Sequence, residues 1–186
     1  MGMFLRQTTI GRVPLAVSMC GVRLGERVLQ IGLNDPAIMA HVAAATGLTG
    51  QAELVVSDEK DAKRACRATA ETGAAVETRV VSSGSLPFDE ATFDVAVIHN
   101  RDGLLGSPET TLSNHTIREC HRVLRPGGRV MAIEEGSPSG LLAWFRPHRP
   151  VTADRGTVAA LAAAGFRAVR AVADREGYRF IEGTRP

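Results

Sequence analysis

Short apolar runs alternate with helix-forming segments along most of this chain, and this alternation constrains the fold more than any other sequence feature. The runs are rich in branched side chains and end in turn residues, which is typical of buried strands. Strands that alternate with helices imply right-handed crossovers and therefore a parallel sheet with helices on both faces, an α/β fold. The predicted strands lie at 27–33, 52–57, 75–81, 93–100 and 129–135.

Helix start and stop signals stand between these strands. Asp35 is a predicted N-cap, Pro36 suits the first helical position, and Gly73 is a predicted helix stop. We expect Gly127 and Gly128 to serve the turn into the following strand, with a positive φ at Gly128. The predicted helices lie at 36–46, 59–71, 109–124 and 153–164.

The last part of the chain contains two more strand-like segments, 166–174 and 177–185. A Glu176-Gly177 turn between them predicts an antiparallel pair. Because the chain has 186 residues, it has room for one core, and we expect a single domain over 1–186.

Two segments stand apart from the strand and helix rhythm. Residues 1–22 form a predicted N-terminal helical segment, and the proline-rich stretch 137–150 is a predicted lid or edge insertion. The insertion carries Trp144, Phe145 and two arginines. It is either a lid that faces an anion or substrate, a contact for a second copy or another protein or a membrane surface, or a solvated loop whose aromatic residues plug the core edge.

Composition excludes several classes of protein. The net charge of +2 gives no global field that would attract nucleic acid. No apolar run reaches the ~18 residues of a membrane span, and the first 20 residues make a poor signal peptide. The three cysteines form no CxxC pair, so we expect buried thiols, no metal site and a cytoplasmic location.

Four motifs stand out along the chain: RLGERVLQIG at 23–32, SLPFDEATFDVAVI at 85–98, RECHRVLRPGGRVMAIEEG at 118–136 and AAGFRAV at 163–169. Their order and spacing resemble those of class I S-adenosylmethionine (SAM)-dependent methyltransferases, specifically the small ubiquinone-biosynthesis-like branch with a type 11 methyltransferase domain. The resemblance covers roughly 23–183 and implies a Rossmann-like, mostly parallel seven-stranded sheet with an antiparallel last strand. Ligand would then lie where the strand order reverses.

The glycine motif of the family is degenerate in this chain. The family ends its first strand with an acid and Gly-x-Gly-x-Gly, where this chain has Gln30-Ile31-Gly32-Leu33-Asn34-Asp35-Pro36. The resemblance therefore assigns cofactor contacts to Gln30, Gly32 and Asn34. Asn34 can adopt a left-handed conformation, whereas the ring of Pro36 narrows the floor of the site.

Other cofactor contacts follow from the same resemblance. Asp58 stands where the family has the acid that accepts from the ribose hydroxyls, although it is equally suited to cap the next helix. Ser82 replaces the acid on the adenine side, and Asn100 ends the fourth predicted strand beside the cofactor.

Methyl transfer from a sulfonium requires alignment and, for some acceptors, a base. His99 ends the fourth predicted strand and is the candidate base, with Asp102 as its orienting partner. The alternative is that His99 only bonds a loop carbonyl at the end of the strand.

Two functions remain open. The first is a SAM-dependent methyltransferase that binds its cofactor weakly and acts on a small molecule. The second is a catalytically silent methyltransferase-like protein with a binding or assembly role. Gln30, Asn34, Pro36 and Ser82 favour the second, and Asp58 and His99 favour the first.

Overall fold

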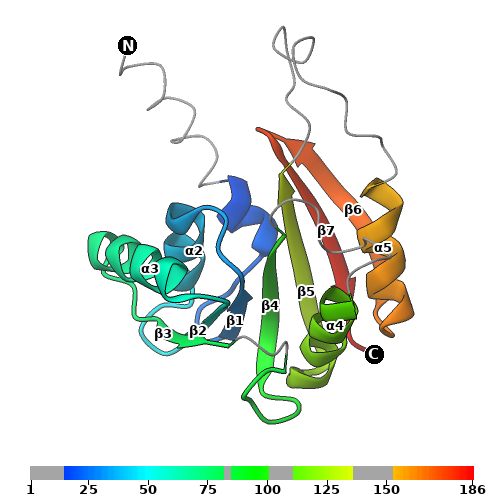
Figure 1. Cartoon of the computed structure of the whole chain (residues 1–186), viewed down its shortest axis with the longest axis horizontal. Coiled ribbons are helices and arrows are strands. Elements are labelled where there is room, and N and C mark those ends of the chain that lie inside the picture. Colours follow the sequence, from blue (N-terminus) through cyan, green and yellow to red (C-terminus); the bar gives the residue numbers. More distant parts are fainter. Residues whose placement is uncertain (1–14, 82–84, 101–110, 136–152) are drawn as a thin grey trace, which may run out of the picture.

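A computed structural model describes residues 15–81, 85–100, 111–135 and 153–186 (Figure 1). Their core is a seven-stranded sheet in the order β3-β2-β1-β4-β5-β7-β6. Neighbouring strands from β3 to β5 are parallel, and β7 is antiparallel to both β5 and β6. The strands are β1 (Arg27–Ile31), β2 (Gln51–Val56), β3 (Glu77–Val80), β4 (Phe93–Asn100), β5 (Leu124–Glu135), β6 (Arg167–Arg175) and β7 (Tyr178–Thr184).

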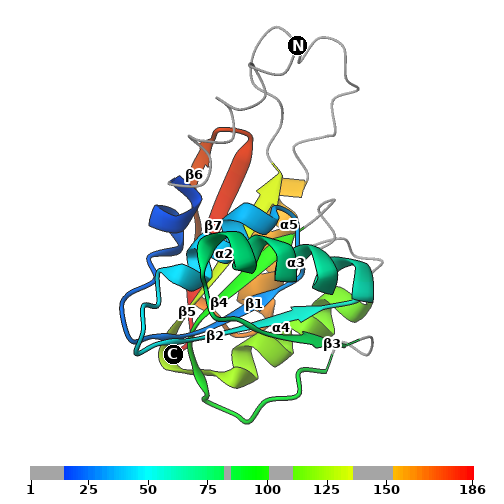
Figure 2. The ribbon, with the colours of Figure 1, turned by 90° about the vertical axis from the view of Figure 1, so that its left-hand side faces the viewer.

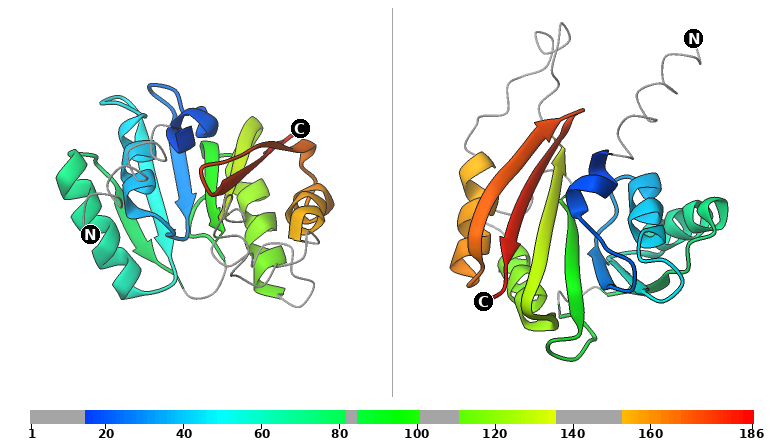
Figure 3. Two further views of the ribbon diagram at one scale, coloured as in Figure 1. Left: turned by 90° about the horizontal axis from the view of Figure 1, so that it is seen from above. Right: turned by 180° about the vertical axis from the view of Figure 1, so that it is seen from behind.

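Helices cover both faces of this sheet, which confirms the predicted α/β architecture. Residues 15–20, α2 and α3 pack on one face, where α3 lies beside α2 and next to β2 and β3, and α4 and α5 pack on the other (Figures 1 and 2). Seen from above, the strands separate the two pairs of helices (Figure 3). The helices are α2 (Pro36–Ala44), α3 (Glu59–Thr72), α4 (Thr111–Val123) and α5 (Ala153–Ala163).

The helix ends follow the local signals in the sequence. Asp35 caps α2 by accepting hydrogen bonds from the backbone N–H groups of Ala37 and Ile38, and Pro36 is the first helical residue. Gly73 ends α3 with φ +71°, a conformation that costs little only in glycine.

The closing hairpin also has the predicted form. Glu176 and Gly177 both have positive φ, 56° and 78°, as a two-residue turn between antiparallel strands requires. The turn pairs β7 with β6, and the other side of β7 pairs with β5. The last strand is therefore inserted into the sheet and not added at its edge.

Two expectations about individual residues are wrong. Gly127 has the positive φ (+77°), whereas Gly128 is constrained by space, because a Cβ there would lie 2.7 Å from the carbonyl oxygen of Arg125. Cys66 is exposed on α3, because it lies on the face of the helix that points away from α2, while Cys20 and Cys120 are buried as expected.

No helix within the described ranges has the length and apolar character needed to cross a membrane. The segments 1–14 and 136–152 lie outside the described residues, and with them most of the predicted N-terminal helical segment and the lid at 137–150.

Candidate functional site

The strand order reverses between β1 and β4, and the carboxyl ends of these two strands approach each other closely. Gly32 follows β1 with φ +75°, and a Cβ on this residue would lie 3.0 Å from the carbonyl oxygen of His99 at the end of β4. The conformation and the contact together require glycine. The surviving glycine of the motif therefore allows the two edges of the crevice to lie in contact.

Gln30 links three elements at this place. It is fully buried on β1, and its Nε2 donates to the carbonyl oxygen of Met39 in α2 at 2.9 Å. Its Oε1 lies 2.9 Å from Nε2 of His99. The register pairs Gln30 with Val97, so His99 is the diagonal neighbour on the same face of the sheet. A contact between Gln30 and a cofactor stays a prediction. The Gln30 side chain would have to make this contact in addition to its bonds with Met39 and His99.

His99 is only 5 % exposed, and its ring is held by Gln30. Burial lowers the pKa of His99 to about 4, while the nearby charge of Asp35 opposes the change. The ring is therefore neutral near pH 7 and keeps a lone pair, as a general base needs. The role of base stays a prediction, and its expected partner Asp102 lies outside the described residues.

Asp35 does more than the sequence predicted. While its Oδ1 caps α2, its Oδ2 accepts a hydrogen bond from the hydroxyl of Tyr178 on β7 at 3.3 Å. The contact joins the start of α2 to a strand 143 residues away in sequence. Sequence reasoning had no signal for this partner, because the pairing depends on the inserted position of β7.

Asn34 lies in the turn between β1 and α2. It does not use the left-handed conformation that we expected to be open to it, because it is not among the described residues with positive φ. Its carbonyl oxygen accepts from Nη2 of Arg64 at 3.2 Å. Its side-chain Nδ2 is buried and has no hydrogen-bond partner in the described structure. A buried donor without an acceptor costs about 1–3 kcal/mol, so this atom is suited to an acceptor on a ligand.

Asp58 is exposed and caps α3, since its Oδ1 accepts from the backbone N–H of Asp61 at 2.8 Å. The residue that ends β2 is the apolar Val56, two positions earlier. The capping bond occupies one oxygen of Asp58, and the ribose contact stays a prediction. Ser82, the predicted adenine contact, lies outside the described residues.

A buried polar group at the ends of β4 and β5 was missed in the sequence. Asn100 lies opposite Glu134 in the register, and its Nδ2 donates to Oε1 of Glu134 at 2.6 Å. The hydroxyl of Thr157 on α5 donates to the same oxygen. All three residues are buried. A strand that ends in two glutamates, 134 and 135, was the available signal, but the register that brings Asn100 to Glu134 is not visible in the sequence.

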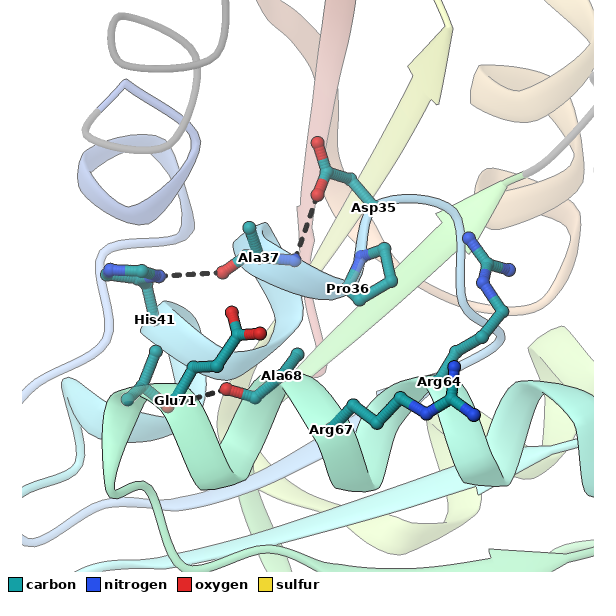
Figure 4. Close-up of a pocket in the computed structure, with 9 residues that line it drawn as sticks. Asp35, Pro36, Ala37, His41, Arg64, Arg67, Ala68 and Glu71 are labelled. Atoms are coloured by element: carbon teal, nitrogen blue, oxygen red, sulfur yellow. Dashed lines mark hydrogen bonds between the residues drawn. The ribbon is translucent and has the colours of Figure 1, made fainter. Parts of the chain in front are cut away.

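A groove of about 350 Å³ opens between α2 and α3 (Figure 4). Asp35 before α2 and Pro36 at the start of α2 line it, and α3 contributes Arg64 and Arg67 to its wall. His41 lines it from α2, with Nδ1 2.8 Å from the carbonyl oxygen of Ala37. No sequence pattern pointed to this groove, because it results from how two helices pack.

The fold and the geometry of the crevice define a class of protein. A parallel sheet in the order 3-2-1-4-5, with an antiparallel strand inserted between the fifth and the sixth, is what the predicted class I methyltransferase fold requires. Comparison with known proteins agrees, since residues 29–132 match the family described as "Methyltransferase domain". The match covers more than half of the chain, which therefore belongs to this family of SAM-dependent class I methyltransferases.

Curated relatives agree with this family match. The chain is 30% identical over 128 residues to the ubiquinone/menaquinone biosynthesis C-methyltransferase UbiE of Pseudomonas putida, covering 68% of this chain and 48% of the relative. The UbiE of Idiomarina loihiensis is 34% identical over 122 residues, which are 63% and 46% of the two chains. The chain thus spans about half the length of these relatives.

Among solved structures, a SAM-dependent methyltransferase from Aquifex aeolicus has a TM-score of 0.72 at 17% identity, covering 93% of this chain and 89% of that chain. The [4+2]-cyclase SpnF has a TM-score of 0.64 at 20% identity, covering 94% and 79%. At these identities the two structures show a shared fold and nothing further.

Proposed function

We propose that this chain binds SAM in the crevice between β1 and β4 and transfers its methyl group to a small molecule. The single observation that carries the proposal is the unpartnered, buried Nδ2 of Asn34 in the turn after β1. The Gly32 turn brings the same segment against β4. SAM would supply a methyl group that is already activated on a sulfonium, so the protein has to align the acceptor and remove its proton where needed.

The residues that would hold SAM are those of the first turn and its neighbours. Gly32 would allow close approach of the backbone, Asn34 would donate to the carboxylate of the amino acid part, and Asp58 would accept from the ribose. We further propose contacts from Ser82 and Asn100.

Binding is expected to be weak, because neutral groups stand where the family has acids. Hydrogen bonds to charged groups contribute about 1.5–3 kcal/mol, against about 1 kcal/mol for neutral ones. The two replacements, at Gln30 and Ser82, would together weaken binding by roughly ten to several hundred fold at about 1.4 kcal/mol per tenfold.

Thermal unfolding and calorimetry with SAM test the proposal directly. Ligand at about 100 times its dissociation constant stabilises a fold by roughly 2.7 kcal/mol. For a domain of this size the melting temperature should rise by about 5 to 11 °C, at roughly 2 to 4 °C per kcal/mol. The absence of both a shift and a binding heat at millimolar SAM would refute the proposal.

The Asn34→Ala variant tests the observation that carries the proposal. It should weaken SAM binding without destabilising the SAM-free protein, because the amide it removes makes no bond there. Asn114→Ala, at an exposed position of α4, is the matched control and should leave binding unchanged. Equal affinities in wild type and Asn34→Ala would show that the ligand does not use this donor.

The second candidate is a silent binding or assembly protein in the cytoplasm. The use of both ends of Gln30 by Met39 and His99 favours it, since the side chain at the acid position is engaged within the protein. A protein that binds neither SAM nor its demethylated product would support this candidate. A second copy or another protein would then be the expected partner, through the segment 137–150.

A further inference from the structure

The side chain of Gln30 forms a chain of two hydrogen bonds from a helix carbonyl to the His99 ring. At one end Nε2 donates to the carbonyl oxygen of Met39, and at the other Oε1 lies 2.9 Å from His99 Nε2. We infer that Gln30 is a positioning residue that fixes His99 in the Nε2–H tautomer and leaves Nδ1 as the only proton acceptor of the ring. The inference deepens the proposed function and rests on it for its catalytic meaning.

The direction of the chain is set at its helix end. The carbonyl oxygen of Met39 can only accept, so the group of Gln30 that faces it must be the NH₂ group. The carbonyl oxygen of the Gln30 amide then faces His99, and it too can only accept. His99 Nε2 must therefore carry the proton.

The opposite arrangement loses hydrogen bonds in a buried place. If His99 carried its proton on Nδ1, the Nε2 lone pair would face the oxygen of Gln30. Rotating the Gln30 amide by 180° would restore a hydrogen bond to His99, but Oε1 of Gln30 would then lie against the carbonyl oxygen of Met39, and neither oxygen can donate. One buried hydrogen bond is lost in either case, which corresponds to a population ratio of roughly ten to one in favour of the Nε2–H form.

The consequence for chemistry concerns the other nitrogen of the ring. Nδ1 of His99 has no hydrogen-bond partner among the described residues. It also differs from the described side-chain atoms that are both fully buried and without a partner, since it does not belong to that group. A proton removed from a methyl acceptor would move to Nδ1, and the ring would then carry one proton on each nitrogen. Gln30 would keep its acceptor against Nε2–H before and after this step.

Glutamine and the acid that the family has at the same place would act differently on the ring. A carboxylate at position 30 would also accept from Nε2–H, but its charge would raise the pKa of the ring and favour the doubly protonated form. A neutral acceptor fixes the tautomer and leaves Nδ1 free of a proton. Asp35 is the charged group that acts on the ring, and the structure turns its carboxylate toward the α2 backbone and Tyr178.

Nuclear magnetic resonance of the full chain with ¹⁵N-labelled histidine tests the inference without any turnover assay. Two-bond proton–nitrogen correlations at pH 7 distinguish a protonated from an unprotonated ring nitrogen, and loss of the signals in His99→Gln assigns them. We expect His99 to show protonated Nε2 and unprotonated Nδ1, in a ratio of roughly ten to one or more. A ring protonated on Nδ1, or an equal mixture of the two forms, would overturn the inference.

Variants at position 30 separate positioning from packing. Gln30→Met keeps the length of the side chain and removes both bonds, so the excess of the Nε2–H form should fall to the smaller one of a histidine ring without a partner. Gln30→Glu should raise the pKa of His99, whereas Gln51→Glu, the same change at an exposed position of β2, should not. An unchanged tautomer ratio in Gln30→Met would overturn the inference even if the protein is less stable.

The same labelled wild-type sample can be titrated with SAM. Nε2–H in a protein that does not bind SAM would refute the proposed function while supporting the role of Gln30 in fixing the ring. SAM binding by a protein whose His99 ring is protonated on Nδ1 would support the proposed function and refute the role of Gln30.

Discussion

The contact between Gly32 and the end of β4 can be measured by comparing two glycines of the same conformation. Gly32 has φ +75° and Gly73 has φ +71°, so alanine at either position is strained by the same backbone geometry. They differ in their surroundings. A Cβ at Gly32 would lie 3.0 Å from the carbonyl oxygen of His99, and a Cβ at Gly73 would meet nothing within 4 Å. The difference between the two variants therefore reports the close approach alone.

The expected magnitudes follow from these two terms. A left-handed conformation costs a residue with a side chain about 1–2 kcal/mol, which is the whole expected cost of Gly73→Ala. Gly32→Ala adds the cost of forcing an atom into a filled space, about 1–3 kcal/mol. We expect Gly32→Ala to be the more destabilising variant by that second amount.

Urea denaturation followed by circular dichroism gives the comparison. With a slope of about 2 kcal/mol per molar urea, the midpoints of the two variants should differ by roughly 0.5 to 1.5 M. The slopes should be equal, because both variants expose the same surface on unfolding. Equal midpoints for Gly32→Ala and Gly73→Ala would show that Gly32 and the end of β4 do not approach as described.

Three further changes probe other parts of the structure by the same denaturation assay. Gly128→Ala should cost about 1–3 kcal/mol through the contact with Arg125, and a stability equal to wild type would contradict it. Glu134→Leu should cost about 1–3 kcal/mol more than Glu134→Gln, because only the amide keeps an acceptor for the two donors; equal losses would refute that role. The folded pKa of His99, about 4, lies below its usual value, so the unfolded chain takes up the proton first as the pH falls. Between pH 7 and pH 5 the free energy of unfolding should therefore drop by about 2 kcal/mol more in wild type than in His99→Gln, and parallel pH profiles would show that the ring is not buried.

Much of the fold could be predicted because its signals are local. The strand at 93–100 has the bounds of β4, and the caps at Asp35 and Gly73 act over a few residues. The constraint at the misjudged Gly128 depends in part on a distant neighbour. The constraint on Gly128 comes from backbone oxygens of Arg125 and Asp94, and the second of these belongs to another strand.

The candidate site could be predicted less completely, for the same physical reason. A resemblance identifies which strand ends carry functional residues, and it pointed to Gln30 and His99 separately. It does not give the register of neighbouring strands, which makes these two residues partners and also brings Asn100 to Glu134. Tyr178 reaches the crevice only because β7 is inserted into the sheet.

The departures from the family motif have different physical consequences, and they should not be treated as one loss. At position 30 the protein uses the new side chain, because Gln30 bonds both Met39 and His99 inside the core. Restoring an acid there would place a carboxylate against the carbonyl oxygen of Met39, where both groups can only accept, and would leave a buried charge with a single donor. At position 34 the protein leaves the new side chain without a partner, since the Nδ2 of Asn34 bonds nothing in the described structure. The first change is therefore tied to the state of the His99 ring, and the second to whatever acceptor enters the turn after β1.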